Sequence, residues 1–268
     1  MNIKKILVIV LALALIFSLG ACDKEKSAAK KDFKAAVEQA NTANDKLDEA
    51  VSNAQGLLEN HGKPLDKTTV SNLKKQIAVT KKAKIKIPDQ PSETEDIKAA
   101  TKKLTAADNS GQVKALKKSQ KALTDSVKQL KLLNKPSEKF VVSRLKNAKY
   151  VNKVVAATED NDPNGQLHKA GGYTAAVFFQ SSLVDQSDVY GSSLIDKGTD
   201  AGGCIEVYGT AADAKERNEY LSAFDGGILS SGGHKVLGTV VIRTSCELTA
   251  SKQKALEKQV IAALTKLN

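Results

Sequence analysis

One short segment has the composition of a cation-binding loop. Residues 160–165 read DNDPNG, the D-x-D-x-N-G form in which Asp160, Asp162 and Asn164 would offer oxygens to a hard cation such as Ca²⁺. The twelfth position of such a loop needs a bidentate Glu, but it is Gly171 here. The same residue types also form ordinary hydrogen-bonded turns. Two hypotheses follow for this loop, a calcium site and a structural turn.

Two of the three cysteines could pair with each other. Cys204 opens a predicted strand, 204–208, and Cys246 follows another, 236–243. If these strands are antiparallel neighbours, the start of one lies beside the end of the other, and a disulfide becomes possible. Closing this loop would stabilise the fold by about 3–4 kcal/mol. We predict this disulfide; buried free thiols and a redox pair are the alternatives.

Catalytic constellations are not evident in the sequence. The three histidines lie in separate loop-like places: His61, His168 and His234. The sequence contains no His-x-x-x-His, Cys-x-x-Cys, Gly-x-Ser-x-Gly or phosphate-loop motif. The Ser-rich stretch 181–193 contains Asp185 and Asp188, which could be combined with His234, but nothing in the spacing supports this and a solvated loop is the better explanation. We therefore predict neither an enzyme nor a cofactor.

The aromatic side chains of the second half are the best candidates for a binding surface. The available ones are Tyr173, Phe178, Phe179, Tyr190, Tyr208 and Tyr220. We predict that four of them form such a surface: Tyr173, Tyr190, Tyr208 and Tyr220. Glu206 lies beside Tyr208 in a predicted strand, where it would be either a buried acid or, as we expect, a residue on an exposed face.

The elements that position these residues alternate between strand and helix. The sequence predicts helices over 138–156 and 211–224 and after Thr249, and strands over 173–179, 204–208 and 236–243. This order predicts an α+β domain over 137–268, with helices on one face of a small, mostly antiparallel sheet. Three Gly-Gly pairs precede or open the predicted strands, at 171–172, 202–203 and 232–233. Each pair suggests either a turn or an anion-binding nest formed by the backbone.

The preceding region, 32–136, has the pattern of a helical bundle of three to four helices. Its first helix carries an apolar stripe interrupted by one Asn: Phe33, Val37, Ala40, Asn44, Leu47, Val51, Ala54 and Leu58. Gly62 and Pro64 should end this helix. Pro136 marks the predicted boundary between the two domains.

The N-terminus has the layout of an export signal. Lys4 and Lys5 precede the apolar run 6–17, which is too short to span about 30 Å of hydrocarbon as a helix. The segment Leu19-Gly20-Ala21-Cys22 resembles the lipobox of bacterial lipoproteins. This resemblance implies that residues 1–21 are removed, that Cys22 carries the lipid, and that residues 22–31 form a tether at the outer face of the cell membrane.

The charge is distributed unevenly. Residues 23–140 contain 25 Lys, no Arg and 16 acidic residues, a net charge of +9, whereas residues 141–268 contain 14 basic and 14 acidic residues. Such a Lys-rich stalk could lie against anionic lipid or a wall polymer, or it could be an ordinary solvated helix surface. The lack of Arg argues against nucleic-acid recognition.

Residues 33–130 are similar to the FIVAR module. The similarity rests on spaced apolar positions in 47–54, 57–58, 65–70, 73–77 and 95–104. It implies a small three-helix bundle of the kind found in Gram-positive surface proteins, often in adhesin-like arrays.

The second half resembles a C-terminal region of Gram-positive lipoproteins, some labelled EbhA-like. The matching residues are 162–165, 171–177, 197–208, 217–221 and 224–227. This resemblance implies a shared fold and a surface location, and no reaction. We therefore expect non-catalytic binding or adhesion at the cell surface, to a wall polymer or to a host or matrix protein. The alternative is a solute- or peptidoglycan-interacting accessory of a transporter or secretion system.

Overall fold

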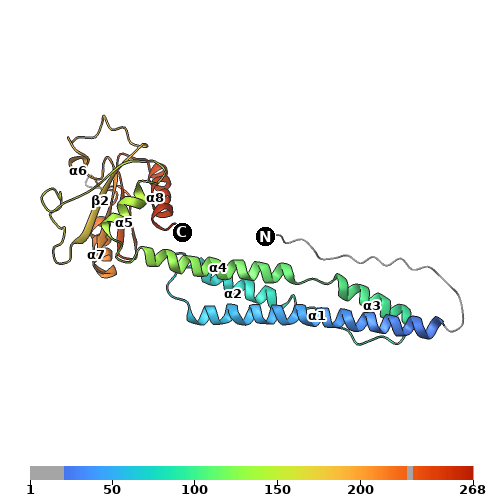
Figure 1. Ribbon diagram of the computed structural model, residues 1–268. Coiled ribbons are helices and arrows are strands. Elements are labelled where there is room, and N and C mark those ends of the chain that lie inside the picture. Colours follow the sequence, from blue (N-terminus) through green and yellow to red (C-terminus); the bar gives the residue numbers. More distant parts are fainter. Residues whose placement is uncertain (1–20, 228–231, 268) are drawn as a thin grey trace. The chain divides into compact units, whose positions relative to one another are not determined.

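The computed structural model describes residues 21–227 and 232–267. Four helices come first (Figure 1): α1 Ala21–Asn60, α2 Thr68–Lys81, α3 Thr94–Ala106 and α4 Ser110–Leu132. The α1 helix includes the segment 22–31, which the sequence predicted as a tether. Ala29 is buried there with Phe33, so apolar packing extends the helix in this direction.

The chain divides into two compact units. One consists of the described residues up to 55 together with 76–117, and the other of 56–75 together with the described residues from 118 onward. Three helices, α1, α2 and α4, contribute residues to both units. The boundary predicted at Pro136 falls inside the second unit.

The apolar stripe of α1 is confirmed as its buried face. Six of its eight residues are buried, and Val37 and Leu58 are partly buried. In the first unit, Phe33 and Ala40 pack with Ile97 and Leu104 of α3. The polar member of the stripe, Asn44, is 5 % exposed and has its own partners.

Asn44 holds an extended segment against α1. Its Nδ2 donates to the Ile85 carbonyl at 2.9 Å, and its Oδ1 accepts from the Ile85 N–H at 2.8 Å. Asn109 Nδ2 also donates to Asn44 Oδ1, at 3.3 Å. The amide therefore satisfies both backbone groups of a residue that has no helix or strand partner of its own.

Substituting Asn44 should destabilise the first unit. Asn44→Leu keeps the stripe apolar but leaves the Ile85 N–H and carbonyl without partners, so we expect a loss of about 2–3 kcal/mol in the free energy of unfolding. Asn53→Leu, at an exposed position of the same helix, is the control and should change it by less than about 0.5 kcal/mol. Urea denaturation followed by circular dichroism measures both. Equal losses in the two variants would contradict this role.

The second unit contains a five-stranded sheet, and the predicted α+β fold class is confirmed. Its strands pair in the order β1-β2-β3-β5-β4, and every pair is antiparallel. Their bounds are β1 Val151–Ala156, β2 Tyr173–Ser181, β3 Gly202–Tyr208, β4 His234–Leu237 and β5 Val240–Thr244. The central strands β3 and β5 are buried along their whole length.

Two predicted elements differ in the structure. The helix predicted over 138–156 ends early: α5 spans Glu138–Leu145, and β1 follows after Tyr150, whose φ is +72°. Val151 and Val155 fit the spacing of a helix, but here they extend the sheet beside β2. The strand predicted over 236–243 is the hairpin of β4 and β5, which turns at Gly238 with φ of +62°.

Helices cover both faces of the sheet, whereas the sequence suggested only one (Figure 1). On one face, α5 and α8 (Ala250–Leu264) pack on residues such as Val177, Ile205 and Ile242. On the other, α6 (Leu194–Lys197) and α7 (Ala211–Ser222) pack on a second cluster that includes Phe178, Cys204 and Val241. Because no face of β3 reaches solvent, any polar side chain on it must find partners inside the protein.

Candidate functional site

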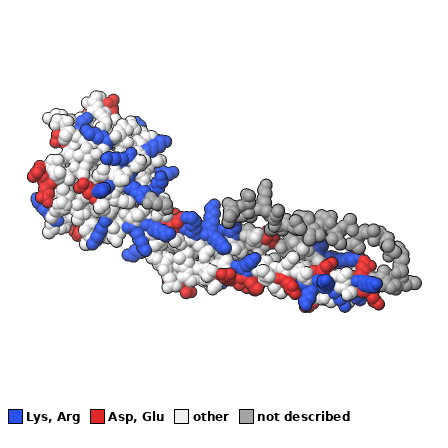
Figure 2. Space-filling view, viewed as in Figure 1, with Lys and Arg blue, Asp and Glu red and all other residues white. Residues whose placement is uncertain are grey.

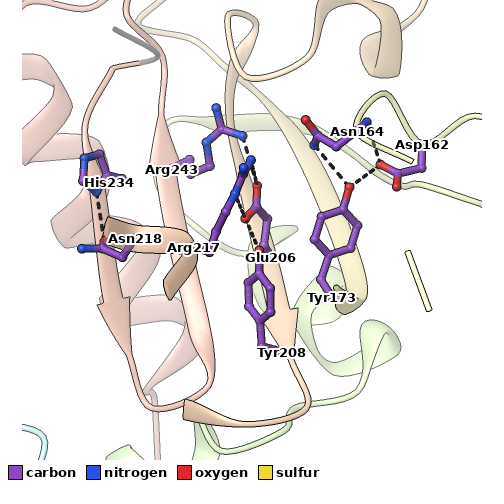
Figure 3. A network of polar contacts seen from close by, with 9 residues as sticks. All are labelled: Asp162, Asn164, Tyr173, Glu206, Tyr208, Arg217, Asn218, His234 and Arg243. Carbon is purple, nitrogen blue, oxygen red and sulfur yellow. Dashed lines mark hydrogen bonds and ion pairs between the residues drawn. The ribbon is translucent and has the colours of Figure 1, made fainter. Parts of the chain in front are cut away.

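A buried carboxylate lies beneath α7. Glu206 is 0 % exposed on β3, so the expectation of an exposed face position was wrong. Its neighbours Cys204 and Tyr208 belong to the apolar cluster on the α7 face, and Glu206 shares that face because strand side chains alternate. Its carboxylate is the centre of the polar network drawn in Figure 3.

Two arginines hold this carboxylate. Arg217 of α7 binds it through both oxygens, with Nε at 3.0 Å from Oε2 and Nη2 at 3.2 Å from Oε1 (Figure 3). Arg243 of β5 donates from Nη1 to Oε1 at 3.0 Å. Burial lowers the pKa of Arg217, but Glu206 more than offsets this and raises it, so the guanidinium stays charged. One buried and one partly buried cation thus share one carboxylate, and within the described residues Arg243 Nε has no hydrogen-bond partner.

Two tyrosines predicted as surface aromatics form the inner wall of this region instead. Tyr173 is 1 % exposed and Tyr208 is 3 % exposed, and their rings meet edge to face at 6.0 Å. The Tyr208 hydroxyl donates to Glu206 Oε2 at 2.9 Å. Burial and the Glu206 charge raise the pKa of Tyr208. Tyr173 and Tyr208 are buried because helices cover this face of the sheet as well, which the sequence did not reveal.

The loop predicted to bind calcium is closed by its own hydrogen bonds. Asp162 accepts from the Tyr173 hydroxyl, and its Oδ2 accepts from the N–H groups of Gln166 at 2.6 Å and Leu167 at 2.9 Å. Burial by itself would raise the pKa of Asp162, but these hydrogen bonds lower it overall. Asn164 Nδ2 donates to the Tyr173 hydroxyl at 3.2 Å (Figure 3).

This geometry favours the structural turn over the calcium site. The Asp162 carboxylate points toward protein donors, Asn164 presents its nitrogen rather than its oxygen to Tyr173, and Asp160 belongs to no group of three possible metal ligands in the described chain. The turn positions residues 166–173 beside α7.

A pocket of about 320 Å³ opens between this loop and α7. The loop contributes Gln166, Ala170, Gly171 and Gly172, the sheet contributes Tyr173 and Tyr208, and α7 contributes Asp213, Glu216, Arg217 and Tyr220. Gly172 has no space for a side chain, because a Cβ would lie 2.0 Å from the Gln166 carbonyl oxygen. The loop backbone therefore packs closely on itself at Gly172.

Tyr220 is the exposed aromatic of this pocket. Its side chain is 57 % exposed, and its ring meets Phe224 edge to face at 5.1 Å. The Arg217 guanidinium, which binds Glu206, lies over the Tyr220 ring at 5.4 Å from its centroid. Of the four tyrosines predicted to form a binding surface, Tyr220 alone combines exposure with a place in this pocket; Tyr190, at 98 % exposed, belongs to the separate loop 187–192.

The arginines are the site residues that the sequence reasoning missed. A signal existed: Glu206 and Arg243 each interrupt a strand of otherwise apolar or small residues, and an acid and a base in two such strands indicate a buried pair. Arg217 is one of several charged residues in α7 and has no comparable signal.

His234 does not join the serine-rich loop. Its Nδ1 lies 3.0 Å from Asn218 Oδ1 (Figure 3), and its Nε2 lies 3.2 Å from the Asp225 carboxylate. Asp185 instead accepts from the Ser187 hydroxyl at 2.7 Å within its own loop. The sequence-level combination of Ser, Asp and His234 is therefore not assembled.

The predicted disulfide is not formed; both thiols are free in the described chain. β3 and β5 are antiparallel neighbours as expected, but their register places Arg243 opposite Cys204. Cys246 lies three residues beyond Arg243, about 10 Å along an extended chain, and a disulfide requires Cα atoms within roughly 7 Å. Cys204 is buried, and the exposed Cys246 places its Sγ 3.4 Å from Asp200 Oδ1.

Thiol labelling should separate the two cysteines. Of these two thiols we expect modification of Cys246 alone in the folded protein, with Cys204 reacting only in denaturant, because burial shields it and raises its pKa. Partial desolvation and the Asp200 and Glu247 carboxylates raise the pKa of Cys246 to about 11. Its labelling rate should thus continue to rise about tenfold per pH unit above pH 9 and level off near this pKa, since the thiolate is the reactive form. Mass spectrometry after timed labelling measures this; lack of labelling at both positions even in denaturant without reductant would indicate a disulfide.

The lipobox prediction lies at the edge of the described chain. Residues 1–20 are outside the described residues, and the side chain of Cys22 is not described. None of the described helices is long and apolar enough to cross a membrane.

Comparisons with protein-family models, with curated proteins and with solved structures find no match to this chain. The FIVAR-like and EbhA-like resemblances therefore remain expectations from the sequence. Functional inference rests on the pocket and its network.

Proposed function

We propose that this protein is lipid-anchored at the outer face of the cell membrane and binds a wall polymer without catalysis. The anchor is Cys22, and the binding site is the pocket between the loop 166–173 and α7. The observation that carries the binding site is Tyr220 with Arg217: an exposed ring beside a guanidinium that a buried carboxylate holds in place. Pockets that bind ligands combine apolar walls with a few fixed polar groups in this way.

The state of the titratable groups supports binding rather than catalysis. Glu206 is fully buried and already accepts from Arg217, Arg243 and Tyr208. A general base must reach the proton that it removes, and this carboxylate does not face the pocket freely. The hydroxyls of Tyr208 and Tyr173 are likewise committed to Glu206 and Asp162.

The pocket size also favours a second candidate, a solute- or peptidoglycan-interacting accessory of a transporter or secretion system. At about 320 Å³ the pocket is at the small end of ligand sites and would hold a short stretch of polymer or one small solute. Competition by soluble fragments distinguishes the two functions, since a polymer-binding protein should prefer the intact wall.

The helical half provides a weaker contact in this proposal. Its lysines can lie against anionic lipid or wall polymer, but several are already paired, such as Lys98 with Glu25 at 2.6 Å and Lys84 with Asp48 at 2.5 Å. On the face in Figure 2, acidic and basic side chains are interspersed over the helices. We expect this contact to be lost as the salt concentration rises.

The test of binding is cosedimentation of the anchored protein, purified in detergent, with isolated cell walls at raised salt. Tyr220→Ala should reduce the bound fraction strongly, because it removes the exposed ring of the pocket. Tyr190→Ala is the matched control, an exposed tyrosine in another loop, and should leave binding unchanged. Equal binding by all three proteins would exclude this pocket. Loss of the protein from the membrane fraction in Cys22→Ala cells tests the anchor separately.

A further inference from the structure

We infer that the pocket recognises a neutral, hydroxyl-rich sugar unit of the wall polymer rather than its anionic groups. This inference rests on the proposed binding function and narrows it to one ligand chemistry. It follows from the hydrogen-bonding groups, the aromatic surface and the charge balance of the pocket.

The pocket offers acceptors and donors close together. The Asp213 and Glu216 carboxylates line it and, within the described residues, neither has a hydrogen-bond or ion-pair partner. Arg217 uses two of its five N–H groups on Glu206, which leaves three as donors. A sugar hydroxyl both donates and accepts, so a row of hydroxyls can satisfy carboxylates and a guanidinium together.

Tyr220 supplies the apolar part of this recognition. Its ring is more than half exposed at the pocket, and its contact with Phe224 restrains it. A sugar ring has an apolar face of C–H groups beside its hydroxyls. The Tyr220 ring can pack against the C–H face of the sugar, because the face of an aromatic ring is apolar and rich in electrons. The flanking carboxylates and guanidinium can bind the hydroxyls at the edge of the sugar.

The charge balance disfavours an anionic ligand. The pocket and the network beneath it contain the carboxylates of Asp162, Glu206, Asp213 and Glu216 and the guanidiniums of Arg217 and Arg243, which sum to −2. The two cations are both engaged with Glu206, whereas the Asp213 and Glu216 carboxylates have no partner among the described residues. A phosphate polymer would meet these like charges, and such juxtaposition opposes binding.

Arg217 is a positioning group as well as a donor. Its bidentate pair with Glu206 fixes the guanidinium plane, and Arg243 and Tyr208 fix Glu206 in turn. The donors are therefore oriented before the ligand arrives, which lowers the cost of binding.

The test measures binding of two probes to the full protein by calorimetry. One probe is an N-acetylglucosamine oligomer, a neutral sugar chain, and the other is poly(glycerol phosphate). We expect the sugar to bind with an affinity that changes little between about 0.05 and 0.5 M salt, since no net charge is paired. Tyr220→Ala and Asp213→Ala should each weaken sugar binding at least about tenfold, which is about 1.4 kcal/mol. Asp213→Asn, which keeps an oxygen acceptor, should weaken it less than Asp213→Ala.

The possible outcomes separate a failure of the inferred sugar ligand from a failure of the proposed wall-binding function. Binding of poly(glycerol phosphate) but not of the sugar would overturn the inference. Binding to whole walls that depends on Tyr220, without binding of the sugar oligomer, would also overturn it but leave the proposed function standing. If Asp213→Ala binds the sugar as tightly as the wild type, the Asp213 carboxylate does not accept from the sugar hydroxyls and the inference fails. Absence of binding to walls and to both probes would overturn both proposals.

Discussion

Replacing Glu206 by Gln should lower the free energy of unfolding by about 3–5 kcal/mol, because it removes one partner of a buried charge network. The substitution preserves the shape of the side chain but leaves the Arg217 and Arg243 guanidiniums without a counter-charge. The uncompensated charge is most costly at Arg243, because its side chain is only 9 % exposed to water, whereas that of Arg217 is 18 % exposed. Urea denaturation of the wild type and the variant measures the difference.

Two further variants make this prediction specific. Glu219→Gln removes an exposed carboxylate that pairs with Lys215 at 2.7 Å on the same helix, and we expect a loss of at most about 0.5 kcal/mol. Adding Arg243→Met to Glu206→Gln removes the more deeply buried cation and should recover part of the lost stability. If Glu206→Gln costs no more than Glu219→Gln, the guanidiniums are solvated in the native protein and the network is not buried as described.

Replacing Gly203 by Ala should cost about 3 kcal/mol or more, at the upper end for added volume in a packed core. Gly203 lies opposite Phe179 of β2 and Thr244 of β5. A Cβ at this position would lie 2.2 Å from the Arg243 carbonyl oxygen and 2.5 Å from the Phe179 ring. The ring could shift, but the carbonyl is part of the β3–β5 pairing and cannot move without disturbing it.

Gly209→Ala is the matched control for this prediction. Gly209 follows β3 directly, and the nearest atom to its Cβ would be an Asp213 carboxylate oxygen at 4.0 Å. We expect this variant to be neutral or slightly stabilising, because Ala restricts the unfolded chain. Thermal unfolding of both variants measures the contrast. Equal melting temperatures for the two would mean that β3 and β5 tolerate a side chain at Gly203.

The sequence does not show why residue 203 must be a glycine. The Gly-Gly pairs suggested turns with positive φ, and Gly171 and Gly232 do have φ of +74° and +88°. Gly203 instead lies within β3, where contact with a neighbouring strand and an aromatic ring excludes a side chain. The residue type is the same in both cases, but the cause depends on which strands become neighbours.

The buried charge network around Glu206 and the proposed binding site share one residue, Arg217. Glu206→Gln should therefore weaken sugar binding as well as stability, since Arg217 loses the partner that orients it. The exposed variant Tyr220→Ala should weaken binding without a comparable loss of stability. These different effects separate the residues that position the pocket from those that contact its ligand.

The sequence by itself determined most of the longer helices and the buried face of α1. The stripe of α1 repeats at alternating steps of three and four residues, and this period is a local property of the helix. The α+β fold class and the strands β2 and β3 were predictable for the same reason, since runs of apolar residues with turn residues between them are local signals.

Only the tertiary structure decided which polar residues are buried and which of them meet. Glu206, Tyr173 and Tyr208 are enclosed because α7 covers the second face of the sheet, and nothing within β2 or β3 specifies that cover. Likewise, the β3–β5 register places Arg243 rather than Cys246 opposite Cys204. Burial and pairing depend on residues distant in the chain, so the same strand sequence is compatible with an exposed acid and a disulfide or with a buried charge network and two free thiols.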